Sequence, residues 1–243
     1  SVWPDDPESI ACLQEIFGYL LTQDTSQHKM FLLIGPKRSG KSTIARVLTR
    51  LLGASNVCNP TLNGLVSTAY GLECMIGTQL AIIGDARLGP RADQQTIAEA
   101  LLGISGEDSQ TIQRKYKTPW TGRLNTRFLI LSNEVPALAD ASGALASRLI
   151  AIETNESFYG REDLGVEQRV SAELHGILHW ALKGLARLRS RGYFIQPQSG
   201  VDLMDELQRS SSPMLNFLED ECELDPDYQI ETGALFEKYA LWC

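Results

Sequence analysis

The stretch GPKRSGKST at 35–43 constrains the fold more than any other feature of the sequence. It fits the pattern G-x-x-x-x-G-K-[ST], and the apolar run FLLI before it and the amphipathic run STIARVLTRLL from 42 onward predict a strand, a loop and a helix. Glycines allow backbone N–H groups to turn toward an anion at the positive end of that helix. A chance match in a glycine-bearing turn is the alternative, and the flanking strand and helix argue against it. The predicted phosphate loop consists of Gly35, Pro36, Lys37, Arg38, Ser39, Gly40, Lys41, Ser42 and Thr43.

The rest of the chain alternates short apolar runs with helical patterns. Buried strands are expected at 30–34, 80–84, 127–131 and 149–153. Asp6 and Asp93 are expected to cap helices, and Gly53 to end one. A single helix is expected over 166–188 and ends before Gly192, with turn-rich passages at QPQSG (196–200) and SSSP (210–213) beyond it. This alternation favours an α/β fold with a mainly parallel sheet covered on both faces.

A phosphate loop of this type predicts ATP and Mg²⁺ as cofactors. Lys41 is expected to reach the β- and γ-phosphates, and the Ser42 hydroxyl to join the Mg²⁺ shell. Asp85, after the run LAII, supplies the carboxylate that the metal needs, unless it is a simple turn aspartate. Ala86 follows, so a second acid is missing there and the residue that activates water is not identified. Asn133, at the end of RFLILS, is expected to orient water beside the γ-phosphate.

Arg148 and the basic segment 113–127 are two further candidate sites. Arg148 precedes the last expected strand, where it is either an arginine finger for an ATP held by a neighbouring subunit or a surface ion pair. The segment 113–127 carries basic residues interleaved with aromatic residues and contains no acid, and its Pro and Gly allow a projecting hairpin. Net charge is −8, so nucleic-acid binding must depend on such a local patch. A solvated basic loop is the alternative. The patch comprises Arg114, Lys115, Tyr116, Lys117, Trp120, Arg123 and Arg127.

The order of these motifs resembles that of the superfamily 3 helicases, and within them the helicase domain of the phage, plasmid and poxvirus primase–helicases. The phrases that carry the match are LQEIFGYLLT, GPKRSGKSTIARVL, ISGEDSQTIQRKYK, RFLILSNEVP and GALASRLIAI, within about residues 4–197. The resemblance implies an AAA+-like core in a hexameric ring that moves 3′ to 5′ on single-stranded DNA and unwinds forked DNA. It also implies a primase domain in the full protein, although the sequence here shows no primase motif.

By this resemblance each candidate residue acquires a role. Lys41 and Ser42 would bind ATP and Mg²⁺, Asp85 would be the strand-end acid, Asn133 the sensor and Arg148 the finger. The hairpin that faces the DNA in the central channel would contain Arg114, Lys115, Tyr116 and Lys117. Asp85 is a single, shorter acid than the family usually has. A nucleotide-gated replication scaffold or loader, and a P-loop small-molecule kinase, therefore stay open as alternatives.

The expected domains are a helical collar segment at 1–26, the ATPase core at 27–158, a helical segment at 159–210 and the start of a further domain at 211–243. The five cysteines are scattered and form no C-x-x-C pair, which favours free thiols in a bacterial or host-cell cytoplasm. No apolar run approaches the ~20 residues that cross a bilayer, so no membrane partner is expected.

Overall fold

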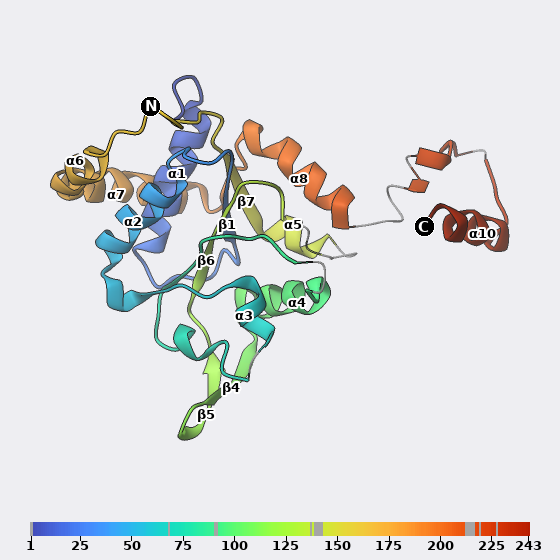
Figure 1. Ribbon diagram of the computed structural model, residues 1–243, viewed down its shortest axis with the longest axis horizontal. Coiled ribbons are helices and arrows are strands. Elements are labelled where there is room, and N and C mark those ends of the chain that lie inside the picture. Colours follow the sequence, from blue (N-terminus) through green and yellow to red (C-terminus); the bar gives the residue numbers. More distant parts are fainter. Residues whose placement is uncertain are drawn as a thin grey trace.

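The computed structural model describes residues 2–67, 69–89, 92–136, 138, 143–211, 217–218, 220–226 and 228–243. A five-stranded parallel sheet in the order β2-β3-β6-β1-β7 forms its centre (Figure 1). Its strands are β1 (Met30–Ile34), β2 (Val57–Cys58), β3 (Leu80–Ile83), β6 (Arg127–Ser132) and β7 (Leu149–Glu153). A separate antiparallel hairpin of β4 (Ser109–Arg114) and β5 (Lys117–Arg123) projects from the body. The predicted α/β fold with a mainly parallel sheet is confirmed.

Helices cover both faces of the sheet. The described helices are α1 (Pro7–Leu20), α2 (Lys41–Leu52), α3 (Leu62–Ser67), α4 (Gln94–Ser105), α5 (Ala144–Arg148), α6 (Val166–Ala172), α7 (Leu174–Arg191), α8 (Gln198–Ser211) and α10 (Thr232–Trp242), with 3₁₀ turns η1 (Ala54–Asn56) and η2 (Glu73–Met75). Of these, α10 lies away from the sheet (Figure 1). Side chains of β1 alternate between two cores: Leu32 and Ile34 pack with α3, α4 and α5, whereas Phe31 and Leu33 pack with α1, α2 and α7. The all-apolar strands are therefore explained by burial on both faces.

The predicted helix ends follow local capping chemistry. Asp6 accepts a hydrogen bond from the Ser9 amide at 2.9 Å, and Asp93 accepts one from the Thr96 amide at 3.0 Å. Gly192, at a φ of 91°, ends α7 with its amide 2.7 Å from the Leu188 carbonyl oxygen. These predictions, and those of the four strands, are confirmed to within two residues at each end.

Helices α1 and α7 pack closely side by side (Figure 1). A Cβ on Gly18 would lie 2.3 Å from the Ala181 carbonyl oxygen, so only glycine allows this approach. Beside it, the buried Glu15 carboxylate receives Arg187 at 2.6 Å and also Arg191. The two helices thus form one layer with α2 on the sheet, and the division into the four expected domains stays a prediction.

Three details of the expected organisation are wrong. The helix expected over 166–188 is two helices, because the chain turns at Glu173 between α6 and α7. The passage QPQSG does not stay a turn, since α8 begins within it at Gln198. Strand β2 was not predicted because two residues carry no periodic signal. Of the SSSP passage, residues 212 and 213 lie outside the described residues. Within the described ranges, no helix combines the length and apolar character that crossing a membrane requires.

Candidate functional site

The predicted phosphate loop follows β1 at the carboxyl edge of the sheet. Gly35 has a φ of 146°, and a Cβ there would lie 2.1 Å from the Thr154 carbonyl oxygen, so a larger residue does not fit. Gly40 has a φ of 96° and begins α2 without any side-chain cap. The first turn of α2 therefore presents an uncapped, positive helix end, the arrangement that suits a bound phosphate. Ser42 is exposed at this helix start, and Thr43 is half-buried.

The Lys41 side chain folds back into this loop and is only 8% exposed. Its Nζ donates to the carbonyl oxygens of Gly35 at 2.7 Å and Pro36 at 2.8 Å. The Ser39 hydroxyl lies 3.1 Å from Nζ, and the Asn133 Oδ1 lies 3.3 Å from it. These acceptors are neutral, and burial lowers the pKa of Lys41. Phosphate oxygens would be stronger partners for the ammonium than neutral ones, so the loop suits a polyphosphate.

Thr154, directly after β7, supports the loop from the next strand. Its buried hydroxyl lies 2.7 Å from the Ser39 Oγ and 3.0 Å from the Ile34 carbonyl oxygen. Sequence reasoning missed Thr154 because no motif includes it. The available signal was its position: like Asp85 and Asn133, it follows a buried parallel strand.

The segment after Thr154 holds the outer side of the loop. The Ser157 hydroxyl donates to the Lys37 carbonyl oxygen at 2.9 Å, and the Phe158 amide donates to the Arg38 carbonyl oxygen at 3.1 Å. The Arg38 side chain lies 3.6 Å from Glu162. The backbone of Lys37 and Arg38 is therefore fixed, while both side chains stay exposed to solvent.

Asn133 and Asp85 differ in where the structure places them. Strand β6 lies between β1 and β3, so Asn133 is the nearer strand-end residue to the loop, and it contacts Lys41. The Asp85 carboxylate is 56% exposed and accepts from the Arg87 backbone amide at 3.2 Å and from its Nε at 3.3 Å. Among the described residues, no hydrogen bond or ion pair joins Asp85 to the loop. Its role as a metal ligand stays a prediction, and Arg87 is a partner that sequence reasoning missed.

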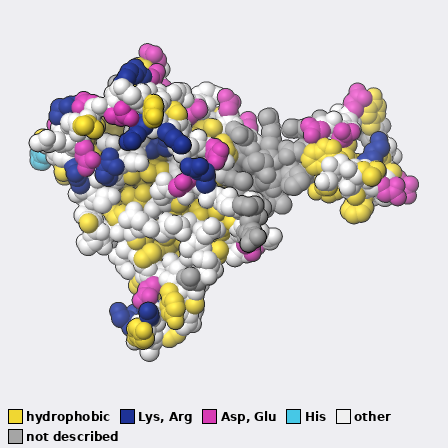
Figure 2. All heavy atoms as spheres, in the orientation of Figure 1, with side chains coloured by type: hydrophobic (Ala, Val, Ile, Leu, Met, Phe, Trp, Pro, Cys, Tyr) yellow, Lys and Arg dark blue, Asp and Glu magenta, His cyan; other side chains and the backbone are white. Residues whose placement is uncertain are grey.

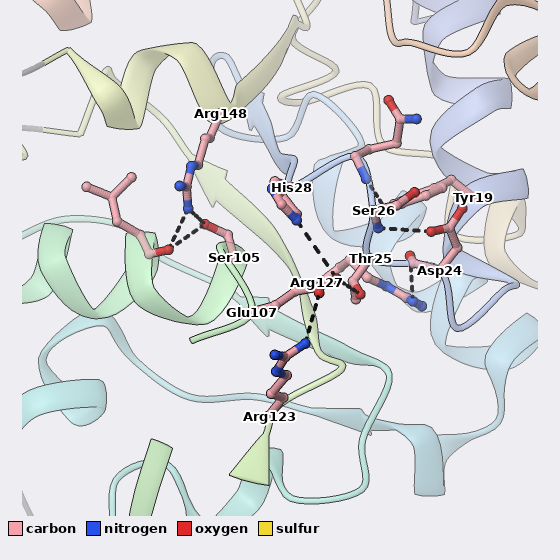
Figure 3. Close-up of polar contacts among 12 residues, drawn as sticks. Tyr19, Asp24, Thr25, Ser26, His28, Ser105, Glu107, Arg123, Arg127 and Arg148 are labelled. Carbon is pink, nitrogen blue, oxygen red and sulfur yellow. Dashed lines mark hydrogen bonds and ion pairs between the residues drawn. The ribbon is translucent and has the colours of Figure 1, made fainter. Parts of the chain in front are cut away.

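Arg148 lies at the opposite, amino edge of the sheet. It immediately precedes Leu149, which pairs with Met30 at the start of β1. Its Nη1 donates to the Leu102 carbonyl oxygen at 2.6 Å and to the Ser105 hydroxyl at 3.1 Å, so the guanidinium caps the end of α4 (Figure 3). Within the described part of the chain Arg148 has no carboxylate partner, which does not favour the surface ion pair.

The basic segment forms the expected hairpin, whose tip carries basic and apolar side chains together (Figure 2). Tyr116 is 93% exposed and has a φ of 61°, an uncommon conformation for an aromatic residue. The Lys115 ammonium lies 5.2 Å from the centre of its ring. Lys117 is exposed, whereas the Arg114 guanidinium donates to the Thr118 carbonyl oxygen at 2.9 Å. The tip thus offers Lys115, Tyr116 and Lys117 to a ligand, with Arg114 bracing the turn.

Arg127 does not belong to this exposed patch, contrary to the sequence prediction. It is 3% exposed and donates to the carbonyl oxygens of Leu20, Thr22 and Asp24, at 3.2, 2.6 and 3.2 Å. Its guanidinium also lies 5.7 Å from the centre of the Tyr19 ring. Burial lowers the pKa of Arg127. The residue fixes the segment between α1 and β1 to the sheet.

Comparisons with known proteins agree with this architecture. Residues 33–148, from β1 to the end of α5, match a family described as of unknown function, DUF5906. An apo structure of the NrS-1 C-terminal region is similar at a TM-score of 0.69 and 12% identity, over 88% of this chain and 50% of that one. A second form has a TM-score of 0.63 and 12% identity, over 85% and 49%. A structure of JCV helicase with a bound acetamide compound has a TM-score of only 0.46 at 15% identity, over 91% and 63%.

The chain thus spans about half the length of the NrS-1 chains that it matches. At 12% identity these likenesses show the fold alone, a parallel sheet with flanking helices.

Proposed function

We propose that the chain is an ATP-hydrolysing DNA helicase domain that works in a ring of copies. The contact of 3.3 Å between the Lys41 Nζ and the Asn133 Oδ1 carries the proposal. It brings a cation from the predicted phosphate loop together with a water-orienting amide from the neighbouring strand, where a γ-phosphate would need both. The ordered motifs that resemble those of the superfamily 3 helicases support the same function.

The residues of the carboxyl edge suit the steps of ATP hydrolysis. Mg²⁺, when bound with ATP, neutralises charge on the β- and γ-phosphate oxygens. The loop amides and Lys41 would hold the phosphates, and the Ser42 hydroxyl and the Asp85 carboxylate would hold the metal. To hold the metal, the Asp85 carboxylate would have to give up its ion pair with Arg87. Asn133 would orient the attacking water, a positioning task that an amide performs without transferring a proton.

The place of Arg148 favours a ring. Strand β1 spans residues 30–34, so ~17 Å separates the amino edge of the sheet, where Arg148 lies, from the phosphate loop. An arginine side chain does not cross that distance, so a phosphate in the loop of one copy requires Arg148 from another. The resemblance implies six copies with 3′ to 5′ movement along single-stranded DNA. In such a ring the hairpin tips would line the channel and contact the strand.

The hairpin tip has the chemistry of a single-strand contact. Lys115 and Lys117 would neutralise phosphates, and the exposed Tyr116 ring would stack on a base. The left-handed backbone of Tyr116 holds its ring away from the protein at a cost in strain, as residues at binding sites often do. This local patch can serve a chain whose net charge is −8, because the rest of the surface repels DNA.

The decisive test is ATP hydrolysis measured with and without single-stranded DNA. We expect DNA to raise turnover, and Lys41→Ala to lower it by about 10² or more at unchanged fold, since it removes a charge from the transition state. Lys183→Ala, an exposed cation on α7, serves as the matched control. Hydrolysis that ignores DNA and depends on a small phosphate acceptor would instead identify a metabolite kinase.

A nucleotide-gated scaffold is the second candidate, and the contact of Asp85 with Arg87 favours it. With that ion pair intact, the Asp85 carboxylate is engaged by Arg87, and Ala86 stands next in sequence where a second acid would polarise water. ATP binding by the purified chain with no turnover, in the presence or absence of DNA, would support the scaffold and overturn the motor. Restoration of turnover by Arg87→Ala would show that the ion pair itself holds the enzyme inactive.

A further inference from the structure

The end of α4 is a turn that Arg148 and Glu107 share. The Asp108 amide donates to the Gly103 carbonyl oxygen at 2.9 Å and the Glu107 amide to that of Ile104 at 3.2 Å, the paired bonds of a Schellman turn. Glu107 occupies the left-handed position of this turn, with a φ of 65°, where glycine or asparagine is usual. A glutamate at this position strains the backbone, so its side chain needs another explanation.

The Glu107 carboxylate supplies that explanation, because it joins separate segments at the amino edge (Figure 3). It accepts a hydrogen bond from the Thr25 hydroxyl, ahead of β1. It also lies 3.9 Å from the His28 Nε2 and 3.9 Å from the Arg123 Nη1. Arg123 is the last residue of β5 and pairs with Ser109, so it forms the base of the hairpin. Glu107 thus attaches the hairpin base to the segment that leads into β1.

Arg148 binds the same turn from its other side. Its Nη1 and the Gly106 amide donate to one acceptor, the Leu102 carbonyl oxygen, at 2.6 and 2.8 Å. A Cβ on Gly106 would lie 2.8 Å from that Nη1, so only glycine lets the guanidinium lie here. The carbonyl that Arg148 holds, on Leu102, therefore lies three residues before the end of α4 at Ser105 and five residues before Glu107.

Arg148 and Glu107 differ in the charge of the groups that they contact. Among the described residues, Arg148 has neutral acceptors only, and the pKa of Lys29 is lowered by burial and by the nearby Arg148 charge. Glu107, in contrast, faces the Arg123 guanidinium on one side and the His28 imidazole on the other. A phosphate would form charge-assisted hydrogen bonds with Arg148, which are about twice as strong as the neutral ones that it would leave. Nucleotide in a neighbouring copy can therefore draw Arg148 away from α4.

From this arrangement we propose that Glu107 is a positioning residue that couples Arg148 to the DNA-contacting hairpin. With Arg148 on α4, the turn is closed and Glu107 holds Arg123. When Arg148 moves to a phosphate, the Leu102 carbonyl loses a donor, the turn loosens, and the hairpin base is released from Glu107. The inference rests on the proposed function, since it needs both a nucleotide that Arg148 reaches and DNA at the hairpin tip.

The test compares Glu107→Gln and Glu107→Gly with the unaltered chain. Glutamine keeps an acceptor for Thr25 and removes the charge facing Arg123, whereas glycine also relieves the left-handed backbone. We measure basal ATP turnover, its stimulation by single-stranded DNA, DNA affinity with and without a non-hydrolysable ATP analogue, and the thermal unfolding midpoint. The unaltered chain should show nucleotide-dependent DNA affinity of about fivefold or more. Both variants should lose that dependence and the stimulation while basal turnover persists.

The glycine variant separates coupling from simple structural support. A residue that only stabilised α4 would leave coupling intact in Glu107→Gly, whose midpoint we expect to be unchanged or higher. Glu99→Gln, an exposed acid of α4 that accepts from Gln95, is the matched control and should couple normally. If the unaltered chain responds to DNA and both Glu107 variants respond equally, the inference is overturned and the helicase proposal stands. If the unaltered chain hydrolyses no ATP, both fall.

Discussion

The two edges of the central sheet hold their cations in different ways. At the carboxyl edge, Lys41 contacts oxygens of its own loop and of one neighbouring strand end. At the amino edge, Arg127 and Arg148 bind carbonyl oxygens at the ends of α1 and α4, more than forty residues away in sequence. One edge is therefore a compact motif, whereas the other is assembled from remote helix ends.

The amino edge itself contains two kinds of guanidinium. Arg127 is buried and binds three carbonyl oxygens of the α1–β1 segment, so it is part of the framework. Arg148 is only half-buried and binds one carbonyl and one hydroxyl, so it can leave. The proposed function requires this difference, because a finger must move while the framework that carries it stays fixed.

Removing Arg148 should give the largest effect and would show whether the two edges meet between copies. Arg148→Ala should lower ATP turnover by about 10³ or more, because a finger neutralises transition-state charge. Mixing it with Lys41→Ala should restore part of the turnover, since one interface of a mixed ring then has both residues. Ser147→Ala, next along α5, should have no comparable effect. If Arg148→Ala kept full turnover, Arg148 would only cap α4 and would not act as a finger.

Arg127→Ala should give the next largest effect, on stability and not on chemistry. It leaves buried carbonyl oxygens without donors and should lower the free energy of unfolding by about 3 kcal/mol. Arg123→Ala, four residues earlier and exposed at the hairpin base, should change it by about 0.5 kcal/mol or less. Urea unfolding of both variants measures the difference. If both variants lost the same free energy of unfolding, Arg127 would contribute no more to the stability of this edge than the exposed Arg123.

Neutralising the hairpin tip should give the smallest effect in free energy. With Lys115 and Lys117 changed to Gln, the slope of log affinity against log salt should flatten by about 1.4, because two phosphate contacts on a single strand are lost. A control removes two exposed cations elsewhere on the chain, Lys183→Gln and Lys238→Gln. DNA binding is measured by titration at several salt concentrations. If the hairpin variant binds DNA unchanged, the hairpin is not part of the DNA interface.

Much of the fold was predictable from sequence because its signals are local. Period, length and capping identified α1, α2 and α4, and uninterrupted apolar runs identified four strands. Strand β2 was too short for such a signal, and the break at Glu173 came from no glycine or proline. At the site, the meeting of Lys41 with Asn133 followed from parallel strand ends at one edge. The contact of Asp85 with Arg87 could not be predicted in this way, because an exposed side chain can pair with any of several nearby partners.

The sequence by itself therefore determined the glycine-bearing loop at 35–43 between a strand and a helix, the alternation of strands and helices, and the existence of a basic hairpin. Each depends on residues adjacent along the chain, whose conformational preferences act before folding. Only the tertiary structure decided that Thr154 supports the loop, that Arg127 is buried, and that Glu107 and Arg148 share one turn. These contacts join residues as far apart as Ile34 and Thr154, separated by 120 positions, and arise only after the sheet orders its strands.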